Sequence, residues 1–239
     1  MRKLLTLLAL LPASALAAFP TVESSITGSA DGDATPTQTM PATVSADALL
    51  ISCVATDTAA TVTFPTTLGT WTNIVNNNNG SEVRMNCFGL EADGTEDSQT
   101  HDLTLGGPIA SAWTIYSITG WEDDTVANGT DPGTQSTGTS TTPDPPSNSP
   151  PWGAGDNLVI AACANDDNDV TTVYSLPDNQ LSVASTGSFE THMTVSSDEL
   201  TSGTDNPGTY TIGASEEWVC NTIHVEEGAA TNTPLRRRR

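Results

Sequence analysis

The sequence predicts an all-β fold: a jelly-roll-like sandwich of two antiparallel sheets, built from two internal repeats. Two observations lead to this prediction. The chain is rich in Thr, Ser, Asn, Asp and Gly but has a single Lys, a composition that suits solvated strands and turns better than helices. Its apolar residues lie in short runs bounded by turn residues, and these runs recur in the same order in both halves of the chain.

The clearest repeat is an apolar run that follows an Asp. Residues 46–55 are ADALLISCVA and residues 155–164 are GDNLVIAACA, so that Leu49 recurs 109 positions later as Leu158. A short apolar run between polar residues predicts a buried strand rather than a helix. We therefore expect four matching core anchors, at Leu49, Ile51, Leu158 and Ile160.

Further anchors recur in the same order. Met85 returns as Met193, and Trp113 returns 105 positions later as Trp218, so the spacing shrinks only slightly along the chain. Each repeat is too short to bury a generous core alone, which favours two halves paired in one sandwich. Trp113 and Trp218 are expected to be core anchors, and a pair of aromatic ligand platforms is the alternative.

The repeats divide the chain into six segments. Residues 1–17 have the basic start, the short apolar centre and the small residues at the cleavage positions of a secretory signal peptide; an uncleaved anchoring helix is the alternative. The others are an extended leader with room for one edge strand (18–40), the first repeat (41–128), a Pro/Thr/Ser-rich linker (129–151), the second repeat (152–228) and a C-terminal tail with an arginine run (229–239). Inside the first repeat, Asn76–Gly80 predicts a turn.

The charge is concentrated in an unusual way. Six of the seven basic residues lie at the extreme ends of the chain, so the part between them has only Arg84 against 29 acidic residues, a net charge of −28. Such a surface repels phosphate backbones and anionic lipid, which argues against nucleic-acid partners and against binding to a membrane surface. No apolar span is expected in the mature chain. The Arg236–Arg239 run is expected to be solvated, with docking on the acidic body of a neighbouring copy as the alternative.

Four cysteines lie within the predicted strands. An even number in an exported chain permits two disulfides, and the pairs Cys53–Cys87 and Cys163–Cys220 keep each bridge inside one repeat. Four buried thiols are the alternative. The spacing of Cys and His residues supports no zinc site.

One acidic loop could bind a hard cation. Asp166, Asp167 and Asp169 offer carboxylate oxygens for calcium, although the loop lacks the Gly and distal Glu of an EF-hand. A solvated acidic turn is the alternative. Calcium is therefore the one cofactor that the sequence suggests.

The sequence offers no convincing catalytic residues. Glu91, Asp93 and Glu96 have the Glu-x-Asp-x-x-Glu spacing of jelly-roll glycosidases, but Asp93-Gly94 predicts a turn that would break the required alignment. The three histidines lie in no hydrolase or zinc motif and are expected to face solvent. We therefore expect a protein that is not an enzyme.

Five stretches of the first repeat support a family resemblance: ADALLISCVATD, TWTNI, EVRMNCFGLEADGTED, HDLTLGG and AWTIYSITG. They resemble duplicated β-sandwich proteins of tailed-phage and environmental phage genomes, which are presumed to belong to the virion surface. The resemblance spans about residues 40–228. It implies a structural or host-contact role without catalysis. A signal peptide departs from that pattern, so a secreted bacterial surface protein remains the alternative source.

These observations predict a surface-exposed structural subunit of a virion or extracellular assembly. Its partners would be copies of itself or other structural subunits, and its location would be extracellular or on the virion surface. A secreted carbohydrate-binding module that presents a glycan surface is the alternative function. That alternative requires exposed aromatic residues, and the chain has only 12 Phe, Trp and Tyr residues.

Overall fold

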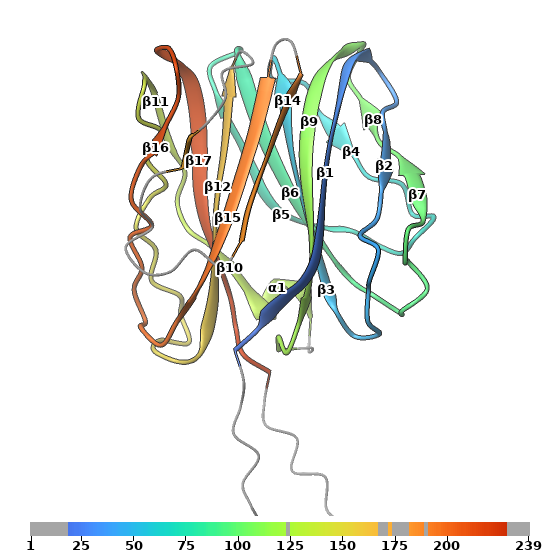
Figure 1. Ribbon diagram of the computed structural model, residues 1–239, viewed down its shortest axis with the longest axis vertical. Coiled ribbons are helices and arrows are strands. Elements are labelled where there is room, and N and C mark those ends of the chain that lie inside the picture. The colour runs from blue at the N-terminus through green and yellow to red at the C-terminus, as the bar shows by residue number, and fades with distance from the viewer. Residues whose placement is uncertain (1–18, 123–124, 167–171, 174–181, 189–190, 229–239) are drawn as a thin grey trace, which may run out of the picture.

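A computed structural model describes residues 19–122, 125–166, 172–173, 182–188 and 191–228, and it shows two antiparallel sheets stacked face to face (Figure 1). The predicted all-β, two-sheet antiparallel sandwich is therefore confirmed. From edge to edge, the first sheet contains β1 (Thr21–Asp33), β9 (Ile109–Thr119), β3 (Leu49–Asp57), β6 (Val83–Glu91) and β5 (Thr72–Asn79).

The second sheet has a matching order. It begins at one edge with β10 (Thr130–Pro132) and β11 (Ser136–Ser140), which both pair with β17 (Glu216–Val225), and continues with β12 (Asn157–Asp166), β15 (Thr191–Leu200) and β14 (Ser182–Ser188). Each strand of the first sheet thus has a counterpart at the same place in the second. The internal duplication itself stays a prediction from the sequence.

The jelly-roll connection is not confirmed. In a jelly roll, the chain crosses repeatedly between the two sheets, whereas here residues 21–119 supply the whole first sheet and residues 130–225 the whole second. The chain passes between the sheets once, through the one-turn helix α1 (Val126–Gly129). Strands that are close in sequence therefore pair within one sheet, which keeps the loops that must close on folding short.

The two sheets pack against each other in a nearly symmetrical way. β3 lies against β12 at the centre, β9 lies against β14 and β15, and correspondingly β17 lies against β5 and β6. Leu49, Ile51, Leu158 and Ile160 all belong to the core between the sheets, and none is more than 2% exposed. Because equivalent strands make equivalent contacts, each half covers the apolar inner face of the other.

The outer face of each sheet is also covered, which explains why the central strands are apolar along their whole length. β3 and β12 are buried from their first residue to their penultimate one. In the first half the cover includes two small ribbons, β2 (Thr37–Thr39) with β7 (Thr100–Asp102) and β4 (Val62–Thr63) with β8 (Thr104–Leu105). In the described part of the second half, the cover includes one ribbon, β13 (Thr172–Val173) with β16 (Tyr210–Thr211), and an isolated bridge between Asn148 and Asp205.

Trp113 and Trp218 anchor these outer layers rather than the core between the sheets. They are 5% and 6% exposed, and they belong to separate apolar clusters on the outer faces. Each is paired with a glycine of the neighbouring edge strand: Gly28 of β1 with Trp113, and Gly138 of β11 with Trp218. A Cβ atom at either glycine would lie 2.5 Å from the indole Cζ2, so each ring rests directly on a glycine.

Two segments differ from the sequence-based expectation. The stretch 129–151, expected as a linker, contributes β10 and β11 to the edge of the second sheet, because backbone hydrogen bonds to β17 hold it without apolar side chains. The asparagine run is not a turn: β5 continues through Asn79, and the reversal comes at 80–82. The Arg84 guanidinium stabilises this strand because it donates to the Asn76 Oδ1 atom across the β5–β6 pair.

The described chain begins and ends at the same end of the sandwich (Figure 1). Thr21 pairs with Thr119, and the Gly228 N–H donates to the Gly120 carbonyl over 2.8 Å. We call this the terminal end. The opposite distal end contains the 80–82 turn and the end of β12 at Asp166. Residues 1–18 and 229–239, which include the predicted signal peptide and the arginine run, lie outside the described part.

Candidate functional site

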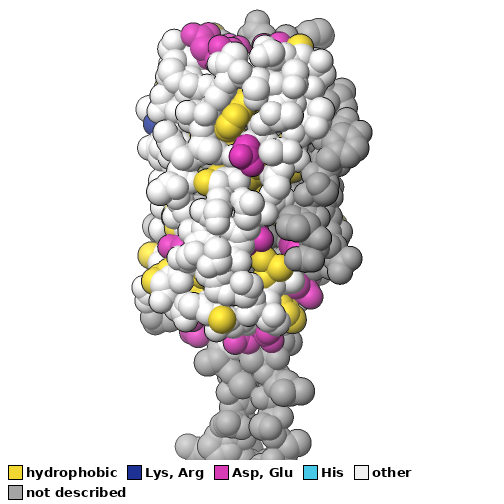
Figure 2. Space-filling model, turned by 90° about the vertical axis from the view of Figure 1, so that its left-hand side faces the viewer, with side chains coloured by type: hydrophobic (Ala, Val, Ile, Leu, Met, Phe, Trp, Pro, Cys, Tyr) yellow, Lys and Arg dark blue, Asp and Glu magenta, His cyan; other side chains and the backbone are white. Residues whose placement is uncertain are grey.

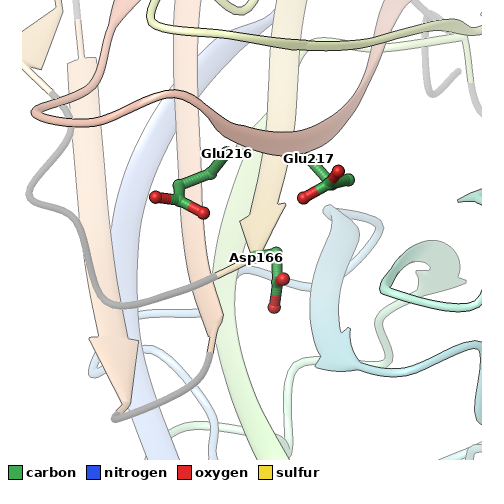
Figure 3. Close-up of side chains that lie close together, drawn as sticks. All are labelled: Asp166, Glu216 and Glu217. Carbon is green, nitrogen blue, oxygen red and sulfur yellow. The ribbon is translucent and has the colours of Figure 1, made fainter.

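Acidic side chains are gathered at both ends of the face shown in Figure 2. At the distal end, Asp166 closes β12 while Glu216 and Glu217 open β17, and the pairing of Asn165 with Trp218 brings them together (Figure 3). One carboxylate oxygen from each of the three lies within 4.8 Å of the others. All three side chains are half-buried, and the Thr139 hydroxyl donates to Glu217 Oε1 over 3.3 Å.

These three carboxylates could supply oxygen ligands to a hard divalent cation. Of the calcium loop predicted from the sequence, the structure describes only Asp166, while Asp167 and Asp169 lie outside the described residues. The sequence gives no signal that Glu216 and Glu217 join Asp166, because they are about 50 positions away and only the β12–β17 pairing brings them close. Calcium binding at this end stays a prediction.

The terminal end contains a pocket of about 410 Å³ beside the edge of the first sheet. Glu91, Asp93 and Glu96 line it together with Leu90 from the same segment. Two other segments complete the lining with apolar residues and threonines: Leu68, Thr70, Thr72, Thr125 and Val126. The volume lies within the range of small-ligand pockets. The pocket therefore combines carboxylates with an apolar lining.

The three pocket carboxylates have different roles. Glu96 is only 2% exposed, and its oxygens accept the backbone N–H groups of Asp93, Gly94 and Thr95, each over 3.0 Å. It therefore stabilises its own turn, as the Asp93-Gly94 sequence suggested. Asp93 accepts the hydroxyl and the N–H of Thr95, and these hydrogen bonds lower its pKa, so Asp93 remains ionised at neutral pH. Glu91 is exposed at the end of β6.

This arrangement does not match the glycosidase geometry considered from the sequence. That mechanism needs two carboxyl groups that project from a strand face toward a sugar, one of them as a proton donor. Here Glu96 is engaged by three backbone N–H groups, and the segment from Asp93 to Glu96 is a turn rather than a strand. The pocket can instead attract a cationic or hydroxyl-rich group.

The expectation that the histidines face solvent is wrong. His101, His192 and His224 are 4%, 5% and 0% exposed. His192 and His224 lie on strands of the second sheet, whereas His101 lies on β7, in a ribbon that covers the first sheet. His101 Nε2 lies 2.9 Å from Gln38 Oε1, and its ring contacts Phe64 and Trp71 edge-on. Burial lowers the pKa of His101 and that of His224 to about 4, so both are neutral at pH 7.

The cysteines form two disulfides in different layers. Cys53 and Cys87 are bonded directly across the β3–β6 pair, and both belong to the core between the sheets. Cys163 and Cys220 are bonded across the β12–β17 pair, within the outer cluster that contains Trp218. Each bridge stays inside one half of the chain. The two bridges are not equivalent, however, since they join different strand pairs and lie on opposite faces of their sheets.

A glycan surface built on exposed aromatic rings receives no support from the described residues. Trp121 is buried, and its Nε1 atom donates to the Asp47 carbonyl over 2.8 Å. Trp71 packs against Phe64, and Trp152 donates to Asn157 Oδ1, and both rings are half-buried. Within the described part of the chain, every Phe, Trp and Tyr side chain is at least partly buried.

Comparisons with protein-family models, with curated proteins and with solved structures each find no match. Among the residues that the structure describes, no helix is both long enough and apolar enough to span a membrane.

Proposed function

We propose that this chain is a non-enzymatic structural subunit, displayed on the surface of a virion or of another extracellular assembly. The observation that carries the proposal is the position of the two described chain ends. Because Thr21 and Gly228 lie at the same end of the sandwich, an attachment through either terminus leaves the distal end free. A rigid body held at one end suits a displayed subunit.

The interior of the molecule supports such a role. Each half provides its own sheet, both faces of the central strands are buried, and a disulfide reinforces each half. Disulfides persist in oxidising environments, which agrees with a location outside the cytoplasm. The described surface has many acidic groups and a single cation, Arg84, which favours solubility and discourages binding to nucleic acid.

Immunogold electron microscopy of particles and surface fractions from the source organism tests the location. We expect many gold labels on each particle or on the cell exterior, and co-purification of the chain with other structural proteins. Recovery of the chain solely as a soluble monomer would contradict the proposal. The measurement needs only an antibody against the folded body.

Cysteine labelling tests the orientation. Ser81 lies in the exposed distal turn, and Thr95 lies in an exposed turn at the terminal end, so Ser81→Cys and Thr95→Cys form a matched pair. In the free subunit, a membrane-impermeant maleimide should label both variants. In the assembled particle, it should label the Ser81→Cys variant and leave the Thr95→Cys variant largely unmodified. The reverse pattern would show that the chain is attached through its distal end.

A further inference from the structure

The pocket at the terminal end has the chemistry of a binding site for a cation that has a hydrocarbon stem. Glu91 and Asp93 contribute carboxylates to its wall, while Leu68, Leu90 and Val126 contribute apolar surface. A guanidinium group is planar and can donate two parallel hydrogen bonds to a carboxylate, and its methylene stem gains from apolar contact. A simple metal ion would make no use of the apolar residues.

The folded body cannot supply such a cation. Arg84 is the one Lys or Arg among the described residues, and it lies toward the distal end. Its guanidinium already donates to Asn76 Oδ1 and to the Ala59 and Ala60 carbonyls. The other basic residues of the chain are Arg2, Lys3 and the four arginines 236–239.

The chain leaves the described fold next to this pocket. Thr125 and Val126 line the pocket and begin the turn of α1, while Gly129, the last residue of that turn, accepts the Glu226 N–H at its carbonyl over 3.0 Å. Gly228 follows two residues later, and Arg236 comes eight residues after Gly228. Eight residues span up to about 26 Å when fully extended, which is ample for a return to a pocket at the same end.

We propose that the pocket lined by Glu91 and Asp93 binds a guanidinium group of Arg236–Arg239 from the same chain. The two carboxylates would hold the guanidinium, and the leucine side chains would contact its stem. The same chain is the favoured source because a short tether gives its arginines an effective concentration in the millimolar range. This binding goes beyond the proposed display function and does not depend on it.

Trypsin provides a direct test, because it cleaves after Lys and Arg and the chain has only seven such residues. Arg84 lies within a paired strand, so cleavage of the folded protein reports on the two ends alone. The test variant is Glu91→Gln with Asp93→Asn, in which the amide at position 93 can still accept the Thr95 N–H. Asp31→Asn with Glu82→Gln is the matched control, since it removes the same charge from exposed residues far from the pocket.

At low ionic strength, we expect mass spectrometry to show loss of the arginine run about fivefold faster in the pocket variant than in the wild type. The control variant should match the wild type. In about 0.5 M NaCl the difference should disappear, because salt screens the ion pairs. Equal rates in the pocket variant and the wild type at low salt would overturn the proposal.

Three further experiments keep the test decisive. If the double variant fails to fold, Glu91→Gln alone changes an exposed side chain and should still accelerate cleavage. The protection should not depend on protein concentration; protection that increases with concentration would assign the arginines to a second copy and overturn the same-chain assignment.

A synthetic peptide of residues 229–239 should bind a chain in which Arg236–Arg239 are Gln. Failure of that peptide to bind, or undiminished binding of the peptide after Glu91→Gln, would also overturn the proposal.

Discussion

Two glycines under tryptophan rings hold the edge strands in register. Gly28→Ala places a methyl group 2.5 Å from the Trp113 ring, so the ring or β1 must move. Overpacking of this kind costs about 1–3 kcal/mol. We expect a lower melting temperature by circular dichroism for Gly28→Ala and for Gly138→Ala. Gly107→Ala is the control, because no atom lies within 4 Å of the added Cβ, and it should leave the melting temperature nearly unchanged.

Two of the three buried histidines, His101 and His224, should make the fold sensitive to acid. Their pKa values of about 4 in the folded protein lie below the usual 6.5, so between these values the unfolded chain binds more protons than the folded one. The free energy of unfolding therefore falls as the pH falls through this window. The loss should be on the order of 1–2 kcal/mol for each histidine, after allowance for partial solvent screening.

His224→Leu isolates one of these contributions. Both ring nitrogens of His224 lack a hydrogen-bond partner, so the substitution breaks no hydrogen bond. Urea unfolding between about pH 7 and pH 5 should show a shallower pH dependence for this variant. A pH dependence equal to that of the wild type would contradict the prediction.

Glu226 is expected to destabilise the fold at neutral pH. Burial raises its pKa, and the nearby Glu122 and Glu227 carboxylates raise it further. A raised pKa means that the folded state favours the protonated form, and this contribution is lost as the pH rises through the folded pKa. Glu226→Gln should therefore stabilise the protein at pH 7 by a few tenths of a kcal/mol. The gain should shrink toward pH 4.5 and in high salt; a loss of stability at pH 7 would contradict it.

At the scale of elements, the Cys163–Cys220 disulfide reinforces the outer cluster of the second half. Among the residues that the structure describes, the outer cluster of the second half comprises Ala161, Cys163, Tyr210, Trp218 and Cys220, fewer than its counterpart in the first half. The Cys163–Cys220 bridge closes a loop of 57 residues, for which chain entropy predicts about 4 kcal/mol. Cys163→Ala with Cys220→Ala should therefore lower the free energy of unfolding in urea by about 2–5 kcal/mol. A loss below about 1 kcal/mol would show that the bridge does not stabilise this face.

The central strands could be predicted from the sequence, but the edge strands could not. A strand that is buried on both faces needs a continuous apolar run, and β3 and β12 show one around Leu49 and Leu158. β11 is Ser-Thr-Gly-Thr-Ser, and it is held by backbone hydrogen bonds and by the Gly138–Trp218 contact. A usable signal was present: the Thr-Gly dipeptides at 27–28 and 137–138 precede the two leucines by 21 and 20 positions.

The candidate site was only partly predictable from the sequence, because segments that are far apart in the chain form its walls. Glu91 and Asp93 are close in sequence, so their spacing alone marks this loop as a candidate site. The pocket itself needs walls from residues 68–72 and 125–126, which only the folded chain brings to that loop. The prediction that the three histidines face solvent was wrong because local sequence does not reveal the loops and ribbons that cover the outer faces of the two sheets.

At the scale of the whole molecule, the sequence predicted two paired halves but not their connection. Apolar runs show which strands are buried, and they contain no information about whether the chain crosses between sheets. The jelly-roll connection is not confirmed on this point, because each half forms its own sheet. The pairing of the halves then follows from the need of each sheet to cover its inner face.

The net charge leads to a prediction for the molecule as a whole. Apart from its two ends, the chain has one arginine against 29 acidic residues, and their mutual repulsion disfavours the compact state. Raising NaCl from about 10 mM to about 0.5 M should therefore increase the melting temperature by several degrees, because the screening length shrinks. A variant with ten surface Asp and Glu residues changed to Asn and Gln should show a smaller response. An increase as large as that of the wild type would contradict an electrostatic origin.

The contact between Gly228 and Gly120 has a practical consequence. Two fluorescent proteins, one joined ahead of Phe19 and the other after Gly228, would become neighbours only when both sheets are complete and stacked. Resonance energy transfer between them would thus follow the closure of the entire sandwich in a single signal, and peeling of either half would abolish it.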